Sequence, residues 1–106
     1  MKRINLNMTE YEFLRNTIQN FGAMIFEEKL EPEIFGSAYC VFVALDGTKF
    51  RLVWDGKEEY AFLQFRNVNN LGEDFDLRVN SVSNLQSPKL IKFLSIAKSL
   101  AQGLPF

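Results

Sequence analysis

The strongest constraint on the fold is the stretch VFVALDGTKFRLVWDGKEEYAFLQF, residues 41–65. Within it, Asp46-Gly47 separates two runs rich in β-branched and aromatic residues, which is the strongest short-range signal for a β-hairpin. A two-residue type I′ turn at these positions fixes the register and predicts one apolar face and one mixed face. The predicted cross-strand pairs are Leu45–Thr48, Val43–Phe50, Val41–Leu52 and Tyr39–Trp54.

A second hairpin is predicted at the turn WDGKEE. A three-residue loop with a left-handed Gly56 places Arg51 opposite Glu59 and Phe50 opposite Tyr60. A four-residue loop shifts the register by one and exchanges the faces. We favour the first register because it sets Arg51 against an acidic residue.

Three further segments have strand character. Residues 60–65 (YAFLQF) carry large side chains on both faces, as strands buried on both sides do. Residues 75–82 (FDLRVNSV) alternate apolar and polar side chains, which predicts an edge or near-edge strand with one solvated face. A weaker alternation in residues 2–8 predicts an additional edge strand before the first helix.

The segment MTEYEFLRNTIQNFGAMIFEEKLEP predicts an N-terminal helix. Thr9 and Glu12 fit a capping box at its start, and Pro32 must end it. Gly22 either lies inside one long or kinked helix, which we favour, or caps a first helix and leaves residues 23–30 as a second short element. The apolar stripe of this helix consists of Leu14, Ile18, Phe21 and Ile25.

The C-terminal segment LQSPKLIKFLSIAKSLAQG is the strongest helix prediction in the chain. Ser87 caps it, Pro88 occupies its first position and Gly103 closes it. Its apolar stripe is formed by Leu90, Phe93, Leu94, Ala97 and Leu100.

The predicted order is therefore α–β–β–β–β–α in a single α+β domain, residues 1–106, with an antiparallel sheet of about four meandering strands packed by both helices. The helices either cover one face each, or they share one face and leave a second face bearing Phe42, Val53 and Phe65 for a partner. The predicted core comprises Val41, Val43, Phe50, Leu52, Leu90, Leu94 and Leu100.

Composition argues against several kinds of chemistry. The 106 residues carry 12 basic and 13 acidic side chains, so a net charge of −1 gives no general reason to expect nucleic-acid binding. The absence of histidine removes the commonest general base and metal ligand. The N-terminus lacks the apolar run of a signal peptide, and no apolar run is long enough to span a membrane, so we expect a cytoplasmic protein.

The remaining reactive groups favour structural roles. Cys40 lies in a predicted strand among apolar neighbours, which is typical of a buried structural thiol. Adjacent carboxylates on a helix or strand point in different directions and do not converge on one metal or substrate atom. Phe42, Tyr60 and Phe62 could stack on RNA bases, but the sequence lacks the basic groove that such a module needs. We therefore expect no enzymatic activity, no cofactor and no metal.

Acidic residues gather in residues 27–33, 55–59 and 73–76, and two aromatic residues adjoin the second of these segments. This pattern serves solubility, or it forms an acidic rim with aromatic anchors that meets a basic partner. The candidate partner-binding residues are Glu27, Glu28, Glu31, Glu33, Trp54, Asp55, Glu58, Glu59, Tyr60, Glu73, Asp74 and Asp76.

A short, histidine-free α+β chain with the hairpin AYCVFVALDGTKFRLVWDGKEEYAFLQF between two helices resembles the small immunity proteins of bacterial polymorphic and contact-dependent toxin systems. The resemblance implies a non-catalytic inhibitor that occludes one cognate toxin, such as a basic nuclease, with acidic residues. The alternatives are a structural or homo-oligomeric module, whose second sheet face pairs with itself as a homodimer, and a small-ligand or RNA-binding domain.

Overall fold

The computed structural model describes residues 6–65, 77–82 and 89–104 of the chain. The strands form one antiparallel sheet in the order β1-β2-β3-β4-β5. The predicted α+β class, with a meandering antiparallel sheet between an N-terminal and a C-terminal helix, is confirmed, and the sheet gains one strand at its β1 edge. The elements are α1 (Leu6–Asn20), β1 (Met24–Glu31), β2 (Ser37–Val43), β3 (Lys49–Asp55), β4 (Tyr60–Phe65), β5 (Leu77–Val82) and α2 (Lys89–Gln102).

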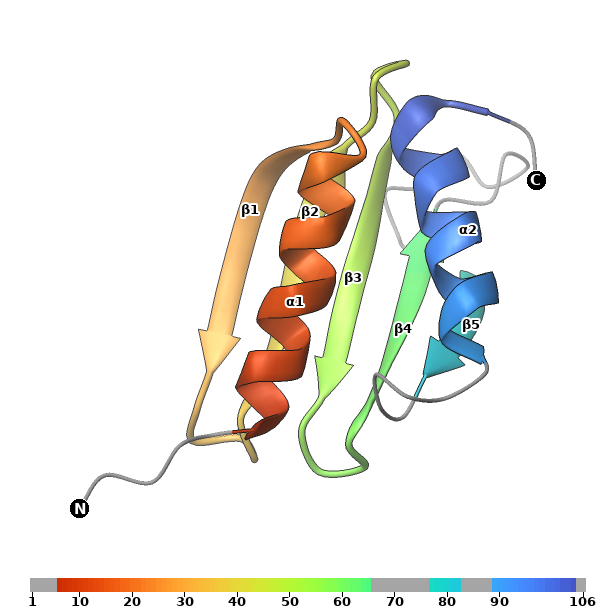
Figure 1. Cartoon of the computed structure of the whole chain (residues 1–106). Coiled ribbons are helices and arrows are strands. Elements are labelled where there is room, and N and C mark those ends of the chain that lie inside the picture. The colour runs from red at the N-terminus through yellow and green to blue at the C-terminus, as the bar shows by residue number, and fades with distance from the viewer. Residues whose placement is uncertain (1–5, 66–76, 83–88, 105–106) are drawn as a thin grey trace.

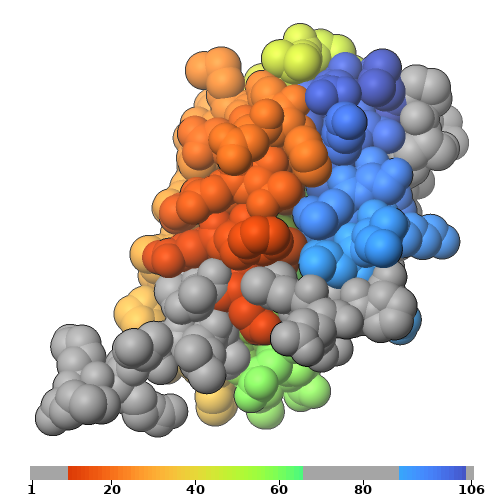
Figure 2. All heavy atoms as spheres, viewed as in Figure 1, coloured from red at the N-terminus to blue at the C-terminus, as the bar shows by residue number. Residues whose placement is uncertain are grey.

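Both helices lie on the same face of the sheet (Figure 1). On that side α1 and α2 run next to each other, and their side chains meet across the surface (Figure 2). The core forms where alternate residues of β2, β3 and β4 face the two helices. Its buried members are Tyr11, Leu14, Ile18, Ala23, Ala38, Cys40, Phe42, Ala44, Phe50, Leu52, Trp54, Ala61, Leu63, Phe93, Ala97 and Ala101.

The predicted register of the first hairpin is wrong by one residue. Phe42 lies opposite Phe50, and their rings stack with centroids 5.3 Å apart. The loop has three residues instead of two, because Ala44 N donates to Thr48 O at 2.7 Å and closes it. The amide of Leu45 is drawn out of the ladder, since it donates to Ala101 O at the end of α2 over 2.8 Å. The even-numbered residues of β2, including Cys40, therefore face the helices.

The second hairpin has the four-residue loop of the alternative prediction, because Asp55 lies opposite Tyr60. Its register is shifted by five residues from the favoured one, and not by one, since Arg51 lies opposite Gln64 instead of Glu59. The left-handed residue is Glu59, with φ of 59°, and not Gly56. In this register Arg51 lies opposite Gln64, to which its guanidinium donates hydrogen bonds, and Phe50 lies opposite Phe65.

The N-terminal helix is shorter than the one we favoured. It ends at Asn20, and Gly22 adopts φ of 121°, which a helix cannot contain. The alternative of a separate second element is therefore correct, but that element is strand β1 and not a helix. The helix also begins at Leu6, which overturns both the capping box at Thr9 and the strand character of residues 6–8; residues 2–5 lie outside the described residues.

The C-terminal helix agrees with its prediction from Lys89 to the left-handed Gly103, while Ser87 and Pro88 lie outside the described residues. Its fully buried residues are Phe93, Ala97 and Ala101. The predicted core residues Leu90, Leu94 and Leu100 are half-buried at the margin of this core. The strand predicted for residues 75–82 is β5, which lies at the edge of the sheet.

We call the side of the sheet away from α1 and α2 the outer face. It carries Val41, Val43 and Val53, which the register places there, whereas Phe42 and Phe65 pack on the helix side. Among the described residues, no helix lies on the outer face. The shared-face alternative is therefore the correct one, with a different set of residues on the second face.

Phe93 tests the docking of α2. Its side chain is fully buried, so Phe93→Ala should lower the free energy of unfolding by about 3–5 kcal/mol. The matched control is Ile91→Ala on the same helix, where the side chain is 79% exposed and the change should stay within about 0.5 kcal/mol. Chemical denaturation measures both. Equal effects of the two substitutions would mean that α2 does not pack as described.

Candidate functional site

Two turns lie side by side at one end of the sheet, the lower end in Figure 1. The first joins β1 to β2 and the second joins β3 to β4. Gly56 N donates to Ser37 Oγ at 3.0 Å, and a Cβ added at Gly56 would collide with Phe35 O. Glycine is therefore required at this contact. We call residues 31–35 and 55–59 together the turn patch.

The first turn is closed by backbone hydrogen bonds from Ile34 N to Glu31 O at 2.9 Å and from Gly36 N to Pro32 O at 3.2 Å. Phe35 has φ of 56°, in the left-handed region that disfavours residues with a Cβ. Its ring is nevertheless 64% exposed, and its neighbour Ile34 is also exposed. This turn therefore presents two apolar side chains to solvent from a strained backbone.

The second turn is organised by Asp55. Its Oδ1 accepts hydrogen bonds from Lys57 N at 3.0 Å and Glu58 N at 3.1 Å. Glu59 N donates to Asp55 O at 2.7 Å, and Glu59 is the second non-glycine residue in the left-handed region. The carboxylate of Asp55 thus holds the turn, while Glu58 and Glu59 project from it and are exposed.

The turn patch concentrates negative charge. It holds five carboxylates and one lysine, a net charge of −4, whereas the whole chain has −1. The lysine, Lys57, lies over the Phe35 ring with its Nζ 5.6 Å from the centroid. Exposed apolar side chains together with carboxylates on the same two turns suit a basic protein surface with an apolar centre.

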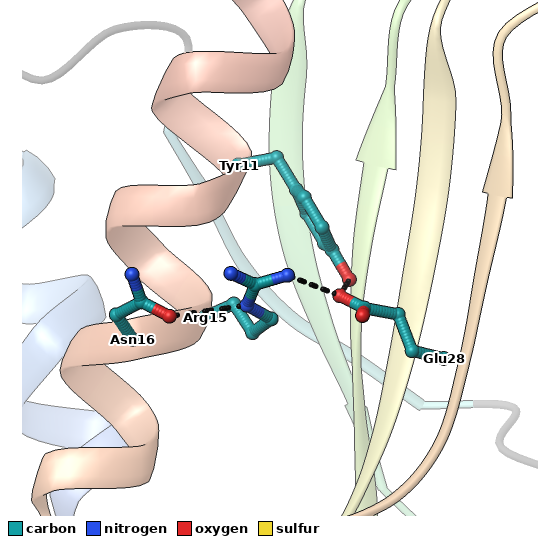
Figure 3. A network of polar contacts seen from close by, with 4 residues as sticks. All are labelled: Tyr11, Arg15, Asn16 and Glu28. Atoms are coloured by element: carbon teal, nitrogen blue, oxygen red, sulfur yellow. Dashed lines mark hydrogen bonds and ion pairs between the residues drawn. The ribbon is translucent and has the colours of Figure 1, made fainter.

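Glu28 lies outside this patch and serves the fold. Its Oε2 accepts hydrogen bonds from Tyr11 Oη at 2.6 Å and from Arg15 at 2.8 Å, both from α1 (Figure 3). Burial alone would raise the pKa of Glu28, but the hydrogen bonds from Arg15 and Tyr11 outweigh burial and lower it. Burial and the bond to Glu28 raise the pKa of Tyr11, so the phenol stays protonated. This network fastens strand β1 to helix α1.

The other predicted site residues occupy different environments. Glu27 lies on the outer face, where Tyr39 Oη donates to it at 3.3 Å, and Tyr60 tilts against Phe62 on the same face with ring centroids 5.6 Å apart. Trp54 is 1% exposed in the helix-side core, so it is inaccessible as an anchor. Trp54 was predicted as a contact residue because it adjoins the acidic second turn, but its side chain points into the core.

Glu73, Asp74 and Asp76 lie outside the described residues, so their part in a site remains a prediction. Glu31 is the last residue of β1 and Glu33 lies in the first turn, and Lys29 Nζ lies 3.7 Å from the Glu31 carboxylate. The structure therefore brings Glu31, Glu33, Asp55, Glu58 and Glu59 together at one end of the sheet.

Ile34 and Phe35 are the residues that sequence reasoning missed. The signal available was the sequence PEIFGS, in which two large apolar residues follow a proline and precede a glycine. Such a segment predicts a turn, and apolar residues at the centre of a turn have little access to the core. The charge pattern identifies the carboxylates of this region, but it says nothing of where these two apolar side chains lie.

Chemically reactive arrangements are sparse in the described part of the chain. Cys40 is fully buried, and burial raises the pKa of its thiol to about 12, so the nucleophilic thiolate is absent near neutral pH. Residues 6–65, 77–82 and 89–104 contain no group of three acidic, cysteine or histidine side chains placed to hold a metal ion. Phe42 lies on the opposite face from Tyr60 and Phe62, so these rings do not form one stacking surface.

Comparison with protein-family models, with curated proteins and with solved structures finds no match for this chain. Neither α1 nor α2, the two helices in the described ranges, combines the length and the apolar character required to span a membrane.

Glu28→Gln tests the network in Figure 3 through its pH dependence. A pKa lowered in the folded state stabilises the protein above the ordinary carboxyl pKa, and this contribution disappears as pH falls through the lowered value. We expect the variant to lose about 1 kcal/mol of unfolding free energy at pH 7, and less as the pH falls. Glu27→Gln is the control, with little change. A deficit in Glu28→Gln that is independent of pH would contradict this account.

Phe35→Asn tests the backbone strain of the first turn. Asparagine tolerates the left-handed region better than phenylalanine, so the variant should gain about 0.5–1 kcal/mol in unfolding free energy. Ile34→Asn is the matched control, because Ile34 is exposed but has no positive φ, and it should give no gain. Thermal and chemical denaturation measure both. A loss of stability in Phe35→Asn would show that the exposed ring stabilises the fold.

Proposed function

We propose that this chain is a non-catalytic, protein-binding inhibitor of the immunity type, and that it binds its cognate protein through the turn patch. The observation that carries the proposal is the exposed Phe35, held in a strained conformation within a turn patch that holds five carboxylates. Strain of this kind costs stability and tends to occur at binding sites, which favours a role in binding.

The charge of the turn patch selects the class of partner. A net charge of −4 at one end of a small domain attracts a basic surface and accelerates encounter. Proteins that cut nucleic acid carry such a surface, because they must bind phosphates. Carboxylates on the turn patch can take the place of those phosphates, so a basic nuclease toxin is the partner chemistry that fits best.

Binding strength requires an apolar contact in addition to charge. Exposed ion pairs at the rim of an interface contribute mainly to association rate, while buried aromatic side chains contribute most of the affinity. Phe35, with Ile34 beside it, is the aromatic group at the centre of the turn patch. It takes the anchoring role that the sequence had suggested for Trp54.

The turn patch is preorganised, which lowers the cost of binding. Asp55 fixes the second turn through two backbone amides, and Ser37 Oγ accepts the Gly56 amide to hold the second turn against the first. The side chains that would contact a partner therefore project from backbones that are already ordered by hydrogen bonds.

The test starts from the gene beside the one for this chain, which we expect to encode a large toxin. The triple variant Glu33→Gln, Glu58→Gln and Glu59→Gln should associate about tenfold more slowly with the toxin domain at low salt, with a weaker salt dependence. Phe35→Asn should weaken binding roughly thirtyfold, the equivalent of an interface hot spot of ~2 kcal/mol. Surface plasmon resonance measures both, and inhibition of toxin activity should fall in parallel.

Glu27→Gln is the matched control, since it removes one carboxylate from mid-strand β1 and leaves both turns intact. It should bind like the wild type. Wild-type rates and affinity in the triple variant and in Phe35→Asn would contradict the proposal, because both substitutions leave the fold in place.

A further inference from the structure

Strand β1 lies at one edge of the sheet, and its outward side meets no other strand in the described part of the chain. Eight residues long, it carries exposed Met24, Phe26 and Leu30. A long edge strand with exposed apolar side chains is a template for pairing with another strand. Soluble proteins usually shorten, cover or charge such an edge. An edge left exposed in this way therefore points to a strand that pairs with it.

The charges at the centre of β1 are complementary to a second copy of the same strand. Glu27 and Lys29 both lie on the outer face, and Glu28 between them lies on the helix side. If two copies of β1 pair antiparallel with Glu28 opposite its own copy, each Glu27 lies opposite the Lys29 of the second copy. Opposite charges directly across an antiparallel pair stabilise it.

The same charges disfavour the neighbouring registers. Sliding the second copy by two residues, which keeps the faces matched, puts Glu27 opposite Glu27 in one direction and Lys29 opposite Lys29 in the other. The two Glu28 side chains meet in the favoured register, but each already has an Arg15 guanidinium 2.8 Å away. Their repulsion is therefore largely neutralised by the network that ties β1 to α1.

We propose that the chain forms a homodimer in which two β1 edges pair antiparallel about Glu28, joining the two sheets into one. Phe26 and Leu30, which are 59% and 48% exposed in the single chain, would lie at the margins of this pairing. The bulge between Ile25 and Glu27 ends the regular part of the edge and limits the pairing to the central charged residues. This dimer does not depend on the inhibitor function, because it uses the strand edge and not the turn patch.

Charge reversal tests the register directly. Glu27→Lys places a lysine opposite Lys29 of the second copy, and Lys29→Glu places two acids opposite each other. Each single variant should dissociate at least about tenfold more readily than the wild type. The double variant carrying both substitutions restores two ion pairs and should dimerise again. Sedimentation equilibrium from about 1 μM to about 1 mM protein measures each dissociation constant.

Mixing the two single variants gives the most specific result. One chain then offers only lysines and the other only glutamates at the two positions, so a heterodimer should form where neither variant dimerises alone. Isotope labelling of one chain lets native mass spectrometry identify it, and thermal unfolding confirms that each variant is folded. A wild type that stays monomeric at the highest concentration, single variants that dimerise like the wild type, or a mixture without heterodimers would each overturn the proposal.

Discussion

The turn at residues 45–47 is the constraint on which the rest of the structure depends. Asp46 Oδ1 accepts hydrogen bonds from Thr48 N at 3.0 Å and Thr48 Oγ1 at 2.7 Å, and Gly47 supplies the positive φ that a three-residue loop needs. Leu45 donates its amide to Ala101 O at the end of α2. The loop thereby sets which residues of β2 face the helices. Its hydrogen bond to Ala101 O also fixes the end of α2 against the sheet. A loop one residue shorter would turn Val41 and Val43 toward the helices instead.

Both functional proposals follow from this placement of the helices on one face. Small side chains at Ala38, Cys40 and Ala44 let α1 and α2 approach the sheet closely, and the two helices together cover the helix side of β2 to β4. Strand β1 then lies at the margin, held to α1 by the network around Glu28 and with its edge directed outward. The turns at the lower end of the sheet extend beyond the ends of the helices in Figure 1.

The sequence predicted the fold class, four of the five strands and the C-terminal helix, because hydrophobic periodicity and local turn signals specify such elements. It did not predict the register, since that depends on a hydrogen bond between Leu45 and Ala101, which are distant in the chain. Strand β1 was missed because its residues have good helix propensity, which tertiary pairing with β2 overrides. Charge counting identified the carboxylates of the turn patch. The exposure of the Phe35 ring depends on the conformation of the turn, which the sequence alone did not predict.

The central claim is that Cys40, Phe42 and Ala44 face two helices packed on one side of the sheet. Nuclear Overhauser effects in a labelled sample measure this directly, because they report proton pairs closer than about 5 Å, comparable to the spacing of directly opposed side chains. The account predicts contacts from the Phe42 and Phe50 rings to side chains of α1 and α2, and none from Val43 to either helix. Contacts from Val43 to the helices, with Phe42 on the opposite face, would contradict the register and every placement that depends on it.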